Sequence, residues 1–151
     1  MDAKITPSEV QQLTTDQILV ASVGKDNKRD PKQIIAMYRM ELANPDAVKL
    51  REGNTIFIVH KSKKPGFGVL RILNADSAYN YARNITAWLK AITKSGFDTI
   101  VVDFKDRQLV NLFKYVEKNP PVPGLSYEMQ VLPSGGYRAI IKFAQVGDKN
   151  V

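Results

Sequence analysis

The sequence has no cysteine and only one histidine, His60, among its 151 residues. The lack of cysteine excludes disulfide bonds, thiolate metal sites and cysteine nucleophiles. With a single histidine, a metal site built on several histidines is excluded, and a Ser-His-Asp triad would need His60 itself. We therefore predict no metal site.

Long apolar runs are also missing. No stretch approaches the length of a transmembrane helix, and the first residues lack the apolar segment of a signal peptide. The apolar content of 44% is ordinary for a globular protein, and the length fits one domain with a sizeable core. We predict one domain over 17–143, a polar segment over 1–16, an exposed tail over 144–151, no membrane association and a cytoplasmic location.

Positive charge is in excess, with 22 lysines and arginines against 15 acidic residues and a net charge of +7. This balance favours anionic partners such as nucleic acid or acidic protein surfaces, although a solvated basic surface gives the same count. One candidate anion-contacting patch consists of Lys61, Lys63, Lys64 and Arg71, extended by Lys90 and Lys94. Because Lys61–Lys64 also read as an ordinary hairpin tip, where lysines protect strand edges, the patch stays an alternative.

The centre of the chain reads strand, helix, strand, helix. Phe67–Leu73 and Thr99–Phe104 are short apolar runs, and the second is rich in β-branched residues. Apolar residues at helical spacing follow each run: Tyr81, Ile85, Trp88, Leu89 and Ile92 after the first, and Leu109, Leu112, Phe113 and Val116 after the second. Gly96 ends the first helix, and a strand–helix–strand unit of this kind predicts a parallel pair.

The flanking segments complete an α+β pattern. Thr6 reads as a helix N-cap, and Gln17–Val23 reads as a first strand or as a continued helix. A charged loop over 24–30 leads to a helix that begins at Pro31, two short strands over 47–50 and 55–60 follow, and a hairpin over 125–143 closes the domain. We predict a mixed, mainly antiparallel sheet of about seven strands, with a central parallel pair and flanking helices.

This order of elements, over 17–143, resembles the GCN5-related N-acetyltransferase (GNAT) fold. Phe97–Val102 is similar to the central strand of that family, and Asp106–Phe113 is similar to the following helix, usually Asn-x-x-Ala-x-x-Leu-Tyr. The resemblance implies acetyl-CoA as the cofactor of an active member. It would bind at the start of the long helix, at Leu73, Asn74, Ala75, Asp76, Ser77, Ala78 and Tyr79.

The departures from the family pattern lie at the positions that carry chemistry. The family's loop before the long helix contains glycines that let backbone N–H groups approach the CoA pyrophosphate, whereas 74–81 has no glycine and carries Asp76. Phe113 stands where the family has its general-acid tyrosine, and Asp106 stands where it usually has asparagine. The resemblance is therefore to a degenerate member.

If the chain is active, Tyr115 is the candidate acid, and Glu128 or His60 is the candidate base. Each has a plainer interpretation: Tyr115 lies two residues beyond the family position, Glu128 alternates toward solvent in its strand, and His60 ends a strand beside a lysine. Tyr81 and Trp88 belong to the apolar stripe of the long helix, so core packing is favoured over a ligand cage.

Three functions follow. The first is a non-catalytic protein with a structural or interaction role, loosely like the small acetyltransferase-like virion proteins of short-tailed bacteriophages; this implies virion proteins as partners and packaging in a particle. The second is an acetyl-CoA-dependent N-acetyltransferase with a divergent site. The third is a basic accessory protein that binds nucleic acid. The fold alone does not choose among them.

Overall fold

A computed structural model describes residues 12–23, 30–105 and 107–143. Within these residues the helices are α1 (Thr15–Val23), α2 (Pro31–Ala43), α3 (Ala78–Ile92) and α4 (Arg107–Lys118), with a 3-10 turn η2 (Thr93–Ser95) after α3. The strands are β1 (Val48–Glu52), β2 (Thr55–Lys61), β3 (Phe67–Asn74), β4 (Thr99–Phe104), β5 (Ser126–Val131) and β6 (Tyr137–Lys142). The expectations at Thr6, over 24–29 and over 144–151 lie outside the described residues.

The strands form one sheet in the order β1-β2-β3-β4-β6-β5. β3 and β4 pair in parallel, and every other neighbouring pair is antiparallel. The predicted mixed sheet with a central parallel pair is thereby confirmed.

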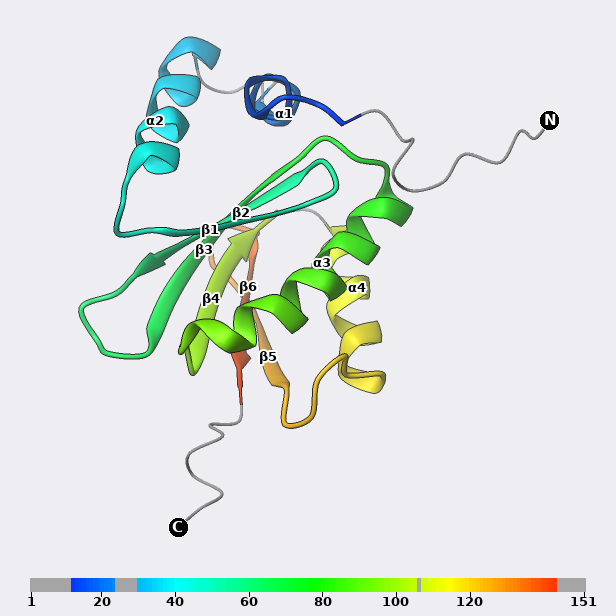
Figure 1. Ribbon diagram of the computed structural model, residues 1–151. Helices are drawn as coiled ribbons and strands as arrows, with labels where there is room; N and C mark the ends of the chain where they lie inside the picture. The colour runs from blue at the N-terminus through cyan, green and yellow to red at the C-terminus, as the bar shows by residue number, and fades with distance from the viewer. Residues whose placement is uncertain (1–11, 24–29, 106, 144–151) are drawn as a thin grey trace, which may run out of the picture.

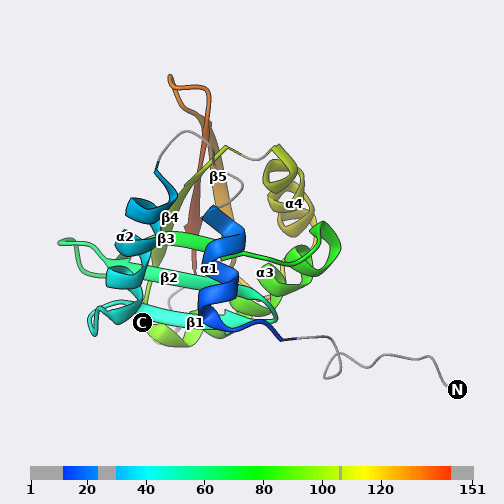
Figure 2. The same ribbon diagram turned by 90° about the horizontal axis from the view of Figure 1, so that it is seen from above.

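Helices cover both faces of the sheet, with α3 and α4 on one side and α1 and α2 on the other (Figures 1 and 2). β2 shows how the sequence fills both layers, because its side chains alternate between them. Phe57 and Val59 join the core beneath α3 and α4, while Ile56 and Ile58 join the core beneath α1 and α2. All four are at most 4% exposed, so β2 is buried on both faces.

The segment read as a first strand, Gln17–Val23, belongs to the helix α1, so the strand prediction is wrong and the described sheet has six strands. Ile18 and Leu19 are fully buried while Val20 is 54% exposed, which is the burial of a helix lying on a surface. The backbone N–H of Gln17 donates to Thr14 Oγ1, and the N–H of Thr14 donates to Gln17 Oε1. This reciprocal capping box is what starts the helix.

Other local predictions are confirmed by the caps and the core. Asp30 accepts a hydrogen bond from the N–H of Lys32 ahead of Pro31, and Gly96 ends the helical segment in the left-handed region at φ 86°. Trp88 is 1% exposed, and its ring stacks on Phe57 with centroids 4.9 Å apart. The long helix therefore packs its aromatic stripe into the core, as its spacing predicted.

Candidate functional site

The candidate site is at the carboxyl ends of the parallel pair. β3 and β4 pair from Phe67–Thr99 to Leu70–Val102 and no further, although β3 continues to Asn74 and β4 to Phe104. The two strands therefore part just before α3 and α4 begin. In open sheets with parallel strands, ligands bind in the crevice at such ends.

The loop from β3 to α3 is held by the carboxylate of Asp76. Asp76 Oδ2 accepts from the backbone N–H of Asn54 at 2.9 Å and from Asn84 Nδ2 at 2.7 Å, and Oδ1 accepts from Asn54 Nδ2 at 3.0 Å. The charge of Asp76 is thus directed into the protein, where it joins the β1–β2 turn to α3. Gly53 makes this approach possible, because its φ of 56° suits glycine and an added Cβ would lie 2.9 Å from both Asp76 and Asn84.

Three backbone donors of the same loop have acceptors within the chain. The N–H of Ala75 donates to the carbonyl of Asn54, and the N–H of Asp76 donates to Asn74 Oδ1. At the start of α3, the N–H of Asn80 donates to the Ser77 hydroxyl, which caps the helix. These donors are not free to bind an incoming anion.

An aromatic cluster fills the space beneath α4 at the end of β4. Phe113 is 2% exposed, and its ring lies 5.8 Å from that of Phe104 and 5.5 Å from that of Tyr127. Phe104 also stacks on Tyr137. Burial raises the pKa of Tyr127 to about 12, and its hydroxyl accepts a hydrogen bond from the N–H of Glu117.

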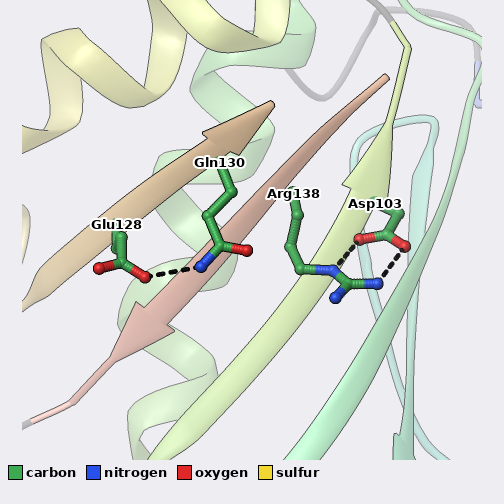
Figure 3. A network of polar contacts seen from close by, with 4 residues as sticks. All are labelled: Asp103, Glu128, Gln130 and Arg138. Carbon is green, nitrogen blue, oxygen red and sulfur yellow. Dashed lines mark hydrogen bonds and ion pairs between the residues drawn. The ribbon is translucent and has the colours of Figure 1, made fainter. Parts of the chain in front are cut away.

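A row of charged and amide side chains lies on the face of the sheet that α1 and α2 cover, on β4, β6 and β5 (Figure 3). Arg138 holds both carboxylate oxygens of Asp103, with Nε donating at 2.7 Å and Nη2 at 3.0 Å. The hydrogen bond from Arg138 lowers the pKa of Asp103. Beside this pair, Gln130 Nε2 donates to Glu128 at 2.9 Å, and both side chains are exposed.

A second charged group on this face is centred on Glu41 of α2. Arg71 Nε lies 2.7 Å and His60 Nε2 2.9 Å from Glu41 Oε1. His60 and Glu41 are close, but the two groups are not aligned for a hydrogen bond. Glu41 Oε2 is buried without a hydrogen-bond partner among the described residues.

The three candidate catalytic residues do not converge. His60 and Glu128 both face the α1 and α2 side of the sheet, on strands β2 and β5 at different ends of the strand order. Tyr115 is 62% exposed on α4, which covers the other face. Asp106 lies outside the described residues.

The candidate anion patch is likewise divided. Lys61, Lys63 and Lys64 are exposed around the β2–β3 turn, where Lys64 lies over the ring of Phe67. That turn and the 3-10 turn after α3 line one small cleft of about 170 Å³. Arg71 is separate from them and is paired with Glu41.

Sequence reasoning missed Glu41 and the pair Asp103–Arg138. Both depend on register: Asp103 and Arg138 become cross-strand partners only when β4 and β6 pair. It also missed a groove of about 630 Å³ between α3 and α4, lined by Tyr79, Arg83, Lys90, Leu112, Tyr115 and Val116 among others. The spacing of Tyr79, Arg83 and Lys90 along α3 was the available signal.

The part of the chain that the structure describes contains neither a cluster of metal ligands nor a helix that could span a membrane. No group of three or more histidine, aspartate or glutamate side chains is placed to hold a metal ion there. No helix in the same residues is long and apolar enough to cross a membrane.

No protein-family model matches the sequence, and no curated protein matches it. In fold, the chain is similar to a chimera of the spermidine N-acetyltransferase SpeG from Vibrio cholerae and hSSAT, with a TM-score of 0.53 at 10% identity over 93% of this chain and 98% of that one. A structure of AAC(6')-Ib in complex with ribostamycin and coenzyme A has a TM-score of 0.54 at 11% identity over 91% and 94%. The ribosomal-protein-S5-alanine acetyltransferase from Vibrio fischeri has a TM-score of 0.52 at 8% identity, over 89% of this chain and 92% of that one. At these identities the similarity establishes a shared fold.

Proposed function

We propose that this chain, which has the fold of the GCN5-related N-acetyltransferases, is a non-catalytic protein that binds other macromolecules. The observation that carries the proposal is that three backbone donors of the loop between β3 and α3 are occupied. The N–H groups of Ala75, Asp76 and Asn80 already donate to acceptors within the chain. A pyrophosphate bound in the family's manner would have to displace them and would also approach the carboxylate of Asp76.

The aromatic cluster supports the same proposal. Phe113 occupies the position that the family resemblance gives to the general acid, and a phenyl ring has no proton to donate. Its ring is buried against Phe104 and Tyr127. The nearby phenol, Tyr115, is on the outer side of α4.

An acetyl-CoA-dependent N-acetyltransferase with a divergent site is the second candidate. The parting of β3 and β4 beyond Leu70 and Val102 favours it, since this is a ligand-binding place in such sheets. Coenzyme A is present in the AAC(6')-Ib complex. In this candidate Tyr115 acts as the acid and Glu128 or His60 as the base, which requires them to be brought together from two faces of the sheet.

Virion proteins of a bacteriophage remain the partner class that the sequence resemblance suggests, and packaging in a particle remains a prediction, as does a cytoplasmic location. Nucleic acid is a further candidate partner because of the net charge of +7.

Calorimetric titration with acetyl-CoA tests the proposal. We expect no binding at about millimolar ligand, which corresponds to a binding free energy weaker than about −4 kcal/mol. Asp76→Asn is the matched variant: it removes the charge but leaves the backbone donors of Ala75 and Asn80 occupied, so we expect no gain in affinity. Micromolar binding by the wild-type protein would overturn the proposal and favour the enzyme. Binding only by the variant would assign the exclusion of CoA to charge rather than to occupied donors.

A further inference from the structure

Most of the charged residues of α3 and α4 are basic. The two helices contain five basic residues, Arg83, Lys90, Arg107, Lys114 and Lys118, and one acidic residue, Glu117. They lie side by side on one face of the sheet (Figures 1 and 2). Among the described residues, the groove between them is lined by Arg83 and Lys90 and by no acidic residue.

The groove has an apolar floor and aromatic edges. Leu112 and Val116 of α4 form part of the floor, together with Ala82 and Ala87 of α3. The alanines are small enough to let another backbone approach closely. Tyr79 is 70% exposed and Tyr115 is 62% exposed, so two large rings face solvent at this surface.

The groove is long enough for a helix of about three turns as the occupant. On α3 the lining residues recur every three or four residues from Tyr79 to Lys90, which is about 16 Å of helix, or three turns. On α4 they recur in the same way from Leu112 to Val116, and Asn119 lies just beyond the end of the helix. An apolar floor between two such stripes accepts the apolar face of a third helix, with anchors spaced three and four residues apart on that helix.

We infer that this groove binds an amphipathic helix of another protein, with apolar anchors on one face and acidic residues along its flanks. Carboxylates on the partner would meet Arg83 and Lys90, and its anchors would cover Leu112 and Val116. A second copy of this chain is disfavoured, because its corresponding helices carry the same positive charge. Single-stranded nucleic acid is disfavoured because the floor is aliphatic and because, in the part of the chain that the structure describes, only two cations line the groove.

This inference names the partner class of the proposed function and rests on it. The test is fluorescence anisotropy with a labelled helical peptide of about four turns, carrying leucines three and four residues apart and glutamates on both flanks. We expect saturable binding in the micromolar range that weakens as salt is added. A peptide with lysine in place of glutamate, and one with the same residues in an order that breaks the leucine stripe, should each bind at least about tenfold more weakly.

Variants locate the binding. Arg83→Glu with Lys90→Glu reverses the charge of two exposed groove residues and should lower the affinity at least about tenfold. Lys114→Glu, which changes an exposed lysine of α4 that does not line the groove, should change it less than about twofold. Circular dichroism checks that each variant is folded. Equal binding of the acidic and basic peptides, or no effect of the double reversal, would overturn the inference.

Two further probes separate the alternatives. Tighter binding of an oligothymidylate than of the acidic peptide, lost in the double reversal, would assign the groove to nucleic acid instead. Acetyl-CoA binding is measured separately, by calorimetric titration of the same protein. Peptide binding together with acetyl-CoA binding would overturn the non-catalytic function but keep the groove. Absence of both would overturn the groove and keep the non-catalytic proposal.

Discussion

Asp76 accepts a hydrogen bond from the backbone N–H of Asn54 at 2.9 Å, so the loop that begins α3 is tied to the turn between β1 and β2. In the sequence Asp76 reads as a charge at a cofactor loop. In the structure its carboxylate holds the loop in place, and Asn84 of α3 also donates a hydrogen bond to it. Its removal therefore changes stability as well as charge.

Asp76→Ala should lower the free energy of unfolding by about 1–3 kcal/mol, because Asn54 and Asn84 lose their acceptor in a partly buried site. Asp46→Ala is the control, since Asp46 is exposed and should shift stability by less than about 0.5 kcal/mol. Urea unfolding followed by circular dichroism measures both. Equal stabilities of the two variants would show that the hydrogen bonds of Asp76 do not stabilise the fold.

Gly53→Ala should be more destabilising than Gly135→Ala. Both glycines have positive φ, at 56° and 95°, so each substitution carries backbone strain of about 1–2 kcal/mol. A Cβ at Gly135 meets nothing within 4 Å, whereas at Gly53 it also presses on Asp76 and Asn84 at 2.9 Å. The difference in free energy of unfolding between the variants isolates the cost of that contact. A larger loss of stability for Gly135→Ala would show that Asp76 and Asn84 move away from the Cβ at position 53 without a cost in free energy.

Tyr127 should make stability fall at high pH. Its pKa is raised to about 12 by burial, above the ordinary value near 10, so the folded state retains a proton that the unfolded state releases. The stability that the protonated Tyr127 phenol contributes is fully present below about pH 10 and is lost as the pH rises toward 12. In Tyr127→Phe, the free energy of unfolding should decline less steeply over this window. Absorbance titration of the tyrosines should lose one late-ionising phenol in the same variant, and a loss of an early one would contradict the assignment.

Phe113→Tyr restores a phenol at the family's acid position but should not create an acetyltransferase. The added hydroxyl enters a site that is 2% exposed, beside Phe104 and Tyr127, and should cost about 1–3 kcal/mol of stability. Tyr115→Phe, at an exposed position, should cost less than about 0.5 kcal/mol. Thermal unfolding and an acetyl-CoA turnover assay measure both effects. Turnover by Phe113→Tyr would mean that the scaffold still binds the cofactor.

The sequence predicted the elements whose signal is local. The stripe of α3, the stop at Gly96 and the start at Pro31 each depend on a few neighbouring residues, and all are confirmed. The strand prediction for 17–23 failed because a segment of seven residues, five of them apolar, is too short to separate a strand from a helix by periodicity. The decisive signal lay just upstream, in the spacing of Thr14 and Gln17.

The candidate site was less predictable because its contacts join distant residues. Asp76 and Asn54 are 22 positions apart, and Arg138 and Asp103 are 35 apart. Neither pair has a sequence signature, since each depends on which strands and turns become neighbours. The missing glycines and Phe113 could be read from the sequence, but the internal use of the loop donors could not.

The strand β2 also determines what an optical probe of this protein would report. The single tryptophan, Trp88, stacks on Phe57, which belongs to the core beneath α3 and α4. On the same strand, Ile56 and Ile58 face the core beneath α1 and α2. The two cores share β2 as a common wall, so loosening of either one disturbs the strand against which the indole rests. Emission from one side chain therefore reports on both halves of the molecule.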